Sequence, residues 1–82
     1  MSIELSTIYE RLTEILREQF DDDTLVATPG LMASQVAGWD SFAHLLLMFA
    51  VEKQFKVKFA ASEMSSLKNV GELADLVQAK SA

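Results

Sequence analysis

The chain of 82 residues has no cysteine, one proline, three glycines and a single histidine. Without cysteine it can form no disulfide and no thiolate metal site, and it has no thiol nucleophile. The scarcity of glycine and proline, together with abundant leucine, alanine, glutamate and lysine, favours helices over short strands. Half of the residues are hydrophobic, so one small domain can build a core without covalent cross-links.

Basic residues are also few, and the formal net charge is −5. Nucleic acid binding needs clustered Lys and Arg, so we expect no nucleic acid partner. The longest nearly apolar run, Phe42 to Val51, is too short for a membrane span, which needs about 20 residues. The N-terminus lacks the basic and apolar stretches of a signal peptide. We therefore expect a cytoplasmic protein that does not insert into membranes, and we expect a monomer.

The first predicted helix covers about residues 3–20. Its apolar side chains recur at steps of three and four residues: Leu5, Ile8, Leu12, Ile15 and Leu16. Three aspartates follow at positions 21–23, and carboxylates are unfavourable at the negative end of a helix dipole, so the helix should end near Phe20. These aspartates lack the spaced ligands of a calcium loop, and we interpret them as a solvated loop.

The rest of the chain predicts a long loop and three further helices in a single domain, residues 1–82. Residues 21–39 contain the turn signals Pro29-Gly30 and Gly38 and are expected to form the loop. Helices are expected at about 41–55, 62–66 and 70–79, the last one started by Asn69 and Glu72 as a capping box. Residues 56–61 are interpreted as an extended connection, because a lone strand would have no partner.

Successive residues of a helix are about 100° apart. With this spacing, the apolar residues of the predicted helix over residues 41–55 fall on two opposite sides. The Phe42 face consists of Phe42, Leu45, Leu46 and Phe49, and the opposite Leu47 face of Leu47, Met48, Val51 and Phe55. Lysine rarely buries its charge, and Lys53 lies on the Phe42 face. We therefore predict that the Leu47 face packs in the core and that the Phe42 face is an exposed partner-binding surface. The alternative is that both faces are buried.

The sequence Gly38-Trp39-Asp40-Ser41-Phe42 opens this helix. It resembles the phosphopantetheine attachment site of the acyl and peptidyl carrier protein family, which is Gly-x-Asp-Ser followed by an apolar residue. The rest of the chain agrees with this family. Glu52-Lys53-Gln54-Phe55 resembles the end of the family's second helix, and Val70-Gly71-Glu72-Leu73 resembles the start of its last helix.

The resemblance implies an all-α four-helix bundle of the acyl carrier type, with three longer helices, one short helix and a long first loop. It implies that a phosphopantetheinyl transferase attaches 4′-phosphopantetheine from coenzyme A to Ser41. Asp40 would help the transferase and its Mg²⁺ and cap the helix. The arm would carry acyl or aminoacyl thioesters from a loading enzyme to downstream transferases or synthases, and the carrier itself would not be an enzyme. Helix N-termini also favour phosphate on general physical grounds.

The second helix departs from the family's pattern. Carriers of general fatty acid synthesis have acidic residues soon after the serine and again in mid-helix, where this chain has Ala43 and Leu46. The helix has no acidic residue between Asp40 and Glu52, and position 61, often acidic in such carriers, is alanine. We therefore hypothesise a dedicated carrier in a specialised lipid or secondary-metabolite pathway, recognised mainly through the Phe42 face.

Two other functional hypotheses compete with that of a carrier protein. A cofactor-free helical interaction domain would use the same apolar face and leave Ser41 unmodified. A small enzyme is disfavoured, because the sequence shows no nucleophile with a base, no carboxylate pair in a plausible cleft and no phosphate loop. His44 is expected to be a packed or edge residue, with no catalytic or metal role, and Trp39 either anchors the loop or lines the arm. The size of any cargo cavity depends on the packing of Leu12, Leu47, Met48, Val51, Leu73 and Leu76.

Overall fold

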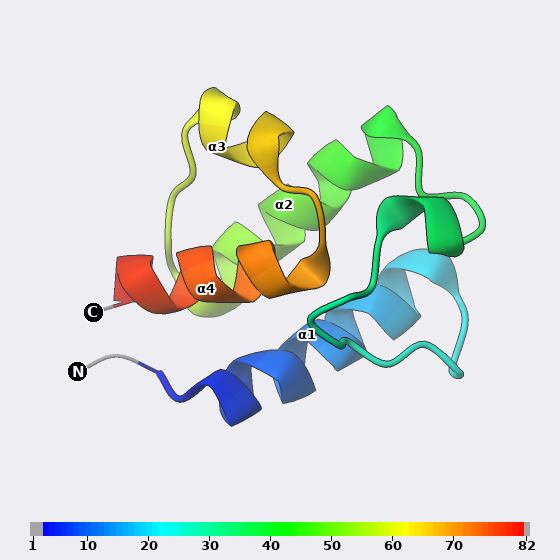
Figure 1. Ribbon diagram of the computed structural model, residues 1–82, viewed down its shortest axis with the longest axis horizontal. Helices are drawn as coiled ribbons and strands as arrows, with labels where there is room; N and C mark the ends of the chain where they lie inside the picture. The colour runs from blue at the N-terminus through cyan, green and yellow to red at the C-terminus, as the bar shows by residue number, and fades with distance from the viewer. Residues whose placement is uncertain (1–2, 82) are drawn as a thin grey trace.

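The computed structural model describes residues 3–81, and within that range it is all-helical with no strand. Its elements are α1 (Leu5–Phe20), the 3₁₀ turn η1 (Ala33–Gln35), α2 (Ser41–Phe55), α3 (Ala61–Ser66) and α4 (Val70–Ser81). In Figure 1, α3 lies on the side of the molecule away from α1, while α4 lies between them in the view. The predicted all-α fold with three longer helices and one short helix is therefore confirmed.

The core lies among α1, α2 and α4. Its largest fully buried side chains are Ile8, Leu12, Leu16, Leu47, Met48, Val51, Val70 and Val77. The Leu47 face of α2 thus packs inward. The Phe42 face remains exposed, with residue exposures from 40 % for Leu46 to 69 % for Phe42. The prediction that the Leu47 face is buried and the Phe42 face is exposed is confirmed, and the alternative that both faces are buried is wrong.

Helix α1 begins at Leu5, two residues after the predicted start, because the preceding backbone bonds to α4 instead. The Ile3 N–H donates to Ser81 Oγ over 3.3 Å, and Gln78 Nε2 donates to the Ile3 carbonyl over 3.2 Å. The helix ends at Phe20, as predicted from the three aspartates that follow it. Asp21 follows in the left-handed region, with φ of 51°.

The loop between α1 and α2 is fixed to α1 by two polar contacts. The Ala27 N–H donates to Thr13 Oγ1 over 2.9 Å, and Arg17 Nε donates to the Leu25 carbonyl over 2.7 Å. The loop also contains η1, which the sequence did not predict. A three-residue element has no periodicity to reveal it, and its start is held by the Gln35 side chain, which accepts from the Met32 N–H over 2.9 Å.

The same loop packs closely against the start of α4. The Val70 N–H donates to the Leu31 carbonyl over 2.9 Å, and the Gly71 N–H donates to the Pro29 carbonyl over 3.0 Å. A Cβ atom on Gly71 would lie 2.8 Å from that Pro29 oxygen. Any side chain at position 71 would therefore push the loop away from α4, which explains the glycine.

The connection from α2 to α4 agrees closely with the sequence. Residues 56–60 form no strand, and the backbone N–H of buried Phe59 donates to Glu52 Oε2 over 2.8 Å. Asn69 caps α4 by accepting from the Glu72 N–H over 2.8 Å. The Glu72 carboxylate accepts from the N–H of Lys68 (3.0 Å), so the reciprocal half of the predicted capping box forms one residue earlier.

The exact bounds of the short and last helices differ slightly from the expected ones. Helix α3 begins one residue before the expected position 62, and α4 continues to Ser81, two residues beyond the expected end. None of the helices within residues 3–81 has the length and apolar character needed to cross a bilayer.

Candidate functional site

Ser41 is exposed at the first position of α2. The preceding residue, Asp40, caps the helix. Its Oδ1 accepts from the Ala43 N–H and its carbonyl accepts from the His44 N–H, both over 2.8 Å. The predicted capping role of Asp40 is confirmed, and the cap fixes the direction in which the Ser41 side chain leaves the helix.

The chain enters α2 through a tight turn. Gly38 has φ of +84°, a conformation that other residues rarely adopt, and its carbonyl accepts from the Asp40 N–H over 3.0 Å. The turn places Ser41 at the positive end of the dipole of a 15-residue helix. A phosphate ester on Ser41 Oγ would be electrostatically stabilised there.

A groove of about 610 Å³ runs beside Ser41, between α2, α3 and the start of α4. Its apolar wall consists of Leu45, Met48, Met64, Leu67, Val70 and Leu73. Asp40, Ser41 and His44 are among the polar residues that also line the groove. The groove therefore offers an apolar surface to a group tethered near Ser41.

Sequence reasoning identified few of the residues that line this groove. Of the six residues whose packing was expected to set the size of a cavity, Met48 and Leu73 are on the wall of the groove, and Leu76 is partly buried against the core. Leu12, Leu47 and Val51 are instead buried in the core. The sequence missed four residues of the apolar wall: Leu45, Met64, Leu67 and Val70. Met64 and Leu67 come from α3 and the segment after it, and the only signal for them was their apolar character beside a predicted short helix.

Trp39 and His44 link the segment before Ser41 to α3. Trp39 Nε1–H donates to His44 Nδ1 over 3.1 Å, and His44 Nε2–H donates to the Met64 carbonyl over 2.8 Å. Both contacts together require the neutral imidazole with its proton on Nε2. Trp39 also packs against Phe20, with ring centroids 5.4 Å apart. Trp39 thus anchors the loop and lines the groove, and His44 is a bridging residue at the groove wall.

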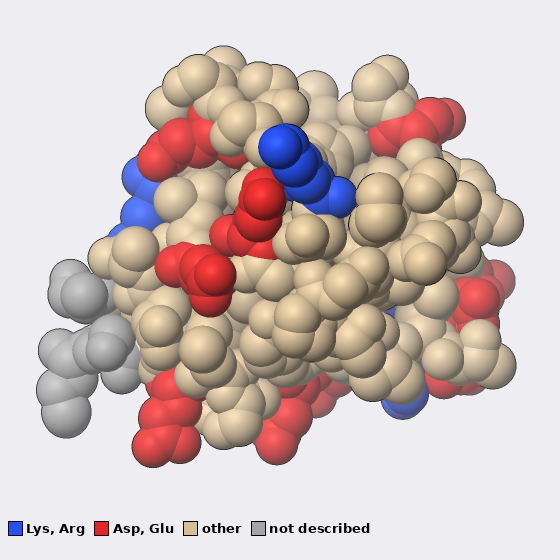
Figure 2. All heavy atoms as spheres, in the orientation of Figure 1, with Lys and Arg blue, Asp and Glu red and all other residues tan. Residues whose placement is uncertain are grey.

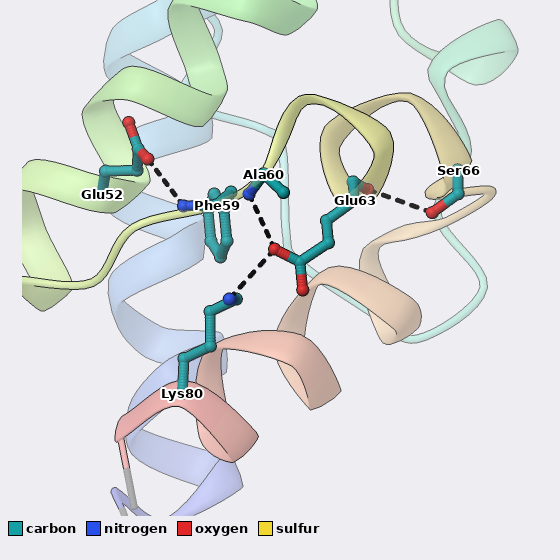
Figure 3. Close-up of polar contacts among 6 residues, drawn as sticks. All are labelled: Glu52, Phe59, Ala60, Glu63, Ser66 and Lys80. Carbon is teal, nitrogen blue, oxygen red and sulfur yellow. Dashed lines mark hydrogen bonds and ion pairs between the residues drawn. The ribbon is translucent and has the colours of Figure 1, made fainter.

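Figure 3 shows how α3 is held at its N-terminal end. Glu63 Oε1 accepts from the Ala60 N–H over 2.7 Å and pairs with Lys80 Nζ over 3.0 Å. The backbone hydrogen bond from Ala60, followed by the hydrogen bond and charge of Lys80, lowers the pKa of Glu63. A carboxyl group with a lowered pKa stays ionised at neutral pH, so the link from α4 to α3 is retained there.

The chain has more acidic than basic side chains, 12 Asp and Glu against 7 Lys and Arg. Figure 2 shows acidic side chains spread over one face of the molecule and basic ones at a few isolated points. Among the aspartates at 21–23, Asp22 forms a local turn by accepting from the hydroxyl and then the backbone N–H of Thr24, which lowers the pKa of Asp22. Across residues 3–81 no cluster of three or more His, Asp or Glu side chains could hold a metal ion.

Known proteins resemble this chain in both sequence and structure. Acyl carrier protein MbtL of Mycobacterium tuberculosis is 32 % identical over 75 residues, which cover 92 % of this chain and 89 % of that protein. MbtL of Mycobacterium bovis matches with the same identity and coverage. The solution structure of a holo acyl carrier protein from Geobacter metallireducens matches with a TM-score of 0.83 and 45 % identity, over 89 % of this chain and 84 % of that one.

No protein-family model matches the sequence. The identity to MbtL over most of both chains nevertheless establishes the relationship, and the four-helix architecture agrees with the Geobacter structure. The resemblance predicted from the Asp-Ser sequence and its context is therefore confirmed. The chain belongs to the acyl carrier protein family, whose members are carriers rather than enzymes and hold their cargo on a covalently attached 4′-phosphopantetheine.

Proposed function

We propose that Ser41 is the residue to which 4′-phosphopantetheine is attached. The observation that supports this proposal is the exposed hydroxyl at the first position of α2, beside an apolar groove. In the attachment step, Ser41 Oγ would bond to the phosphorus next to the pantetheine of coenzyme A, lose its proton, and release 3′,5′-ADP. The attached group supplies a terminal thiol that carries cargo as a thioester. The apolar groove wall supports an acyl cargo.

The proposal is tested by loading the purified chain. Incubation with coenzyme A, Mg²⁺ and a broad-specificity phosphopantetheinyl transferase should add the mass of one phosphopantetheine group, read by intact mass spectrometry. Peptide mapping should place that group on Ser41. A chain that gains no mass under conditions that load a known carrier would contradict the proposal and favour the cofactor-free interaction domain.

Asp40 has two roles in the proposal, one as the cap of α2 and one as a charge beside the transferase's Mg²⁺. Asp40→Ala removes both and should lower the free energy of unfolding by about 1 kcal/mol. Asp40→Asn keeps a side-chain oxygen to accept from the Ala43 N–H, so its stability should stay close to that of the wild type. Both variants should load more slowly, since both lack the charge.

Urea denaturation and initial loading rates separate these two roles of Asp40. If Asp40→Asn loads at the wild-type rate while Asp40→Ala does not, capping alone accounts for the importance of this residue and the proposed role of the charge is wrong.

We also propose that partner enzymes recognise the Phe42 face and that the carrier serves a specialised pathway. All four side chains of this face are at least 40 % exposed, and Phe49 is half exposed. Between Asp40 and Glu52 the helix offers no carboxylate to a basic partner. Exposed apolar surface of this kind is typical of protein interfaces. The cytoplasmic location stays a prediction.

General fatty acid synthases should use this carrier poorly. Their basic docking surfaces bind carboxylates of the carrier, and α2 has Ala43 and Leu46 in the corresponding places. We therefore expect elongation with a kcat/KM at least about tenfold below that of their own carrier, a loss of about 1.4 kcal/mol in transition-state binding. Intact mass spectrometry of the loaded carrier provides the control, because it separates poor recognition from failed loading. Elongation as efficient as that of the enzymes' own carrier would contradict a specialised role.

A further inference from the structure

Helix α3 forms one wall of the groove, but little apolar burial holds it in place. Ala61, Met64 and Ser65 line the groove from α3. None of the six residues of α3 is buried, and Met64 is only partly covered where it packs against the core. Segments with little buried apolar surface open at low free energy. The position of α3 therefore depends strongly on its polar contacts with the longer helices.

We propose that His44 is a positioning residue that fixes α3 against α2 and thereby sets the opening of the groove beside Ser41. The position of α3 is a property of the chain alone. Its consequence for an attached cargo rests on the proposed function, because a wider groove would shield an apolar cargo less well.

The Met64 carbonyl is the group through which His44 holds α3. The last carbonyls of a helix lack intrahelical partners. The Lys68 N–H, which would bond to the Met64 carbonyl if α3 continued, donates to Glu72 instead, over 3.0 Å. The neighbouring Ser62 and Glu63 carbonyls accept from serine hydroxyls within α3. For Met64 the hydrogen bond comes from His44 Nε2 on α2, at 2.8 Å.

Trp39 orients the imidazole for this contact. Because Trp39 Nε1–H donates to His44 Nδ1, the imidazole proton must lie on Nε2, facing the Met64 carbonyl. The two aromatic rings are nearly parallel, 22° apart, with centroids separated by 6.1 Å. Ser41 lies three residues before His44, about one turn away on the same side of α2. A single side chain therefore connects the proposed attachment segment to α3.

A second polar link to α3 acts at a different place. Lys80 holds Glu63 near the N-terminal end of α3, as Figure 3 shows. The hydrogen bond from His44 reaches the Met64 carbonyl, close to the groove. Loss of the His44 contact should consequently loosen the groove wall while the link from α4 remains.

Two variants of His44 separate its hydrogen bonds. The amide nitrogen of His44→Gln can occupy the place of Nε2 and donate to the Met64 carbonyl, but the variant has no acceptor in the place of Nδ1. The amide oxygen of His44→Asn can occupy the place of Nδ1 and accept from Trp39, but the variant does not reach Met64. Asn and His have similar helix propensities. Gln54→Asn, on the same helix away from the groove, is the matched control.

The variants should give opposite results in two measurements on the unloaded chain. Backbone hydrogen exchange of residues 62–67 should be about tenfold faster in His44→Asn than in the wild type, as expected for the loss of the hydrogen bond to Met64. In His44→Gln, which keeps this bond, the exchange should stay within about threefold of the wild type. The fluorescence of Trp39, the only tryptophan, should shift in His44→Gln and stay close to the wild type in His44→Asn. Gln54→Asn should change neither, and circular dichroism checks that each variant is folded.

The proposal is overturned if His44→Asn leaves the exchange of residues 62–67 at the wild-type rate, or if His44→Gln accelerates it as much as His44→Asn does. Neither measurement requires the prosthetic group. A chain that failed to load on Ser41 would therefore contradict the proposed function and leave the position of α3 still open to this test.

Discussion

Ser41→Ala should abolish loading completely: after incubation with coenzyme A, Mg²⁺ and the transferase, the variant should keep its original mass. Alanine has no oxygen to form the phosphodiester. The substitution should not disturb the fold, because Ser41 is exposed, alanine is the best helix former, and the cap of α2 is supplied by Asp40. Circular dichroism and the unfolding midpoint should match those of the wild type.

Ser65→Ala provides the matched control for Ser41→Ala. Ser65 is another exposed serine that lines the groove, on α3, and its hydroxyl donates to the Ser62 carbonyl over 3.2 Å. This variant should load as the wild type does. If Ser41→Ala still gained the mass of a phosphopantetheine group, or if Ser65→Ala lost it, the attachment site would be misassigned.

The parts of the structure that the sequence predicted well depend on local interactions. The end of α1 follows from carboxylates next to it in the chain, and the starts of α2 and α4 follow from the caps Asp40 and Asn69. The orientation of α2 followed from one charge, that of Lys53, on an otherwise ambiguous helix. The resemblance to the acyl carrier protein family likewise rested on short local sequences: the one around Ser41, the end of α2 and the start of α4.

The groove could not be predicted in this way, because contacts between residues far apart in the sequence form it. The bond from His44 to Met64 spans twenty residues, and the position of the loop depends on the close approach of Gly71 to Pro29. Periodicity shows which residues of a helix are apolar, but it does not show which neighbour covers them. For α3, whose six residues are all at least partly exposed, even the apolar pattern was weak.

Two adjacent leucines of α2 should respond very differently to truncation, because they lie on opposite faces. Leu47 is completely buried, and Leu47→Ala should lower the free energy of unfolding by about 2–5 kcal/mol. That is a large part of the roughly 4–12 kcal/mol expected for a domain of this size. Leu46 is 40 % exposed, and Leu46→Ala should lower stability by less than about 1 kcal/mol. Urea denaturation followed by circular dichroism measures both.

The same pair tests whether the Phe42 face is a docking surface. With the phosphopantetheinyl transferase as the partner, Leu46→Ala should raise the KM for the carrier about fivefold or more, as loss of an interface contact worth about 1 kcal/mol predicts. Leu47→Ala should leave that KM near the wild-type value at temperatures where the variant is folded, because its side chain does not reach the surface. Equal destabilisation by the two substitutions would contradict the assignment of the faces. An unchanged KM for Leu46→Ala would place transferase recognition elsewhere than on this leucine.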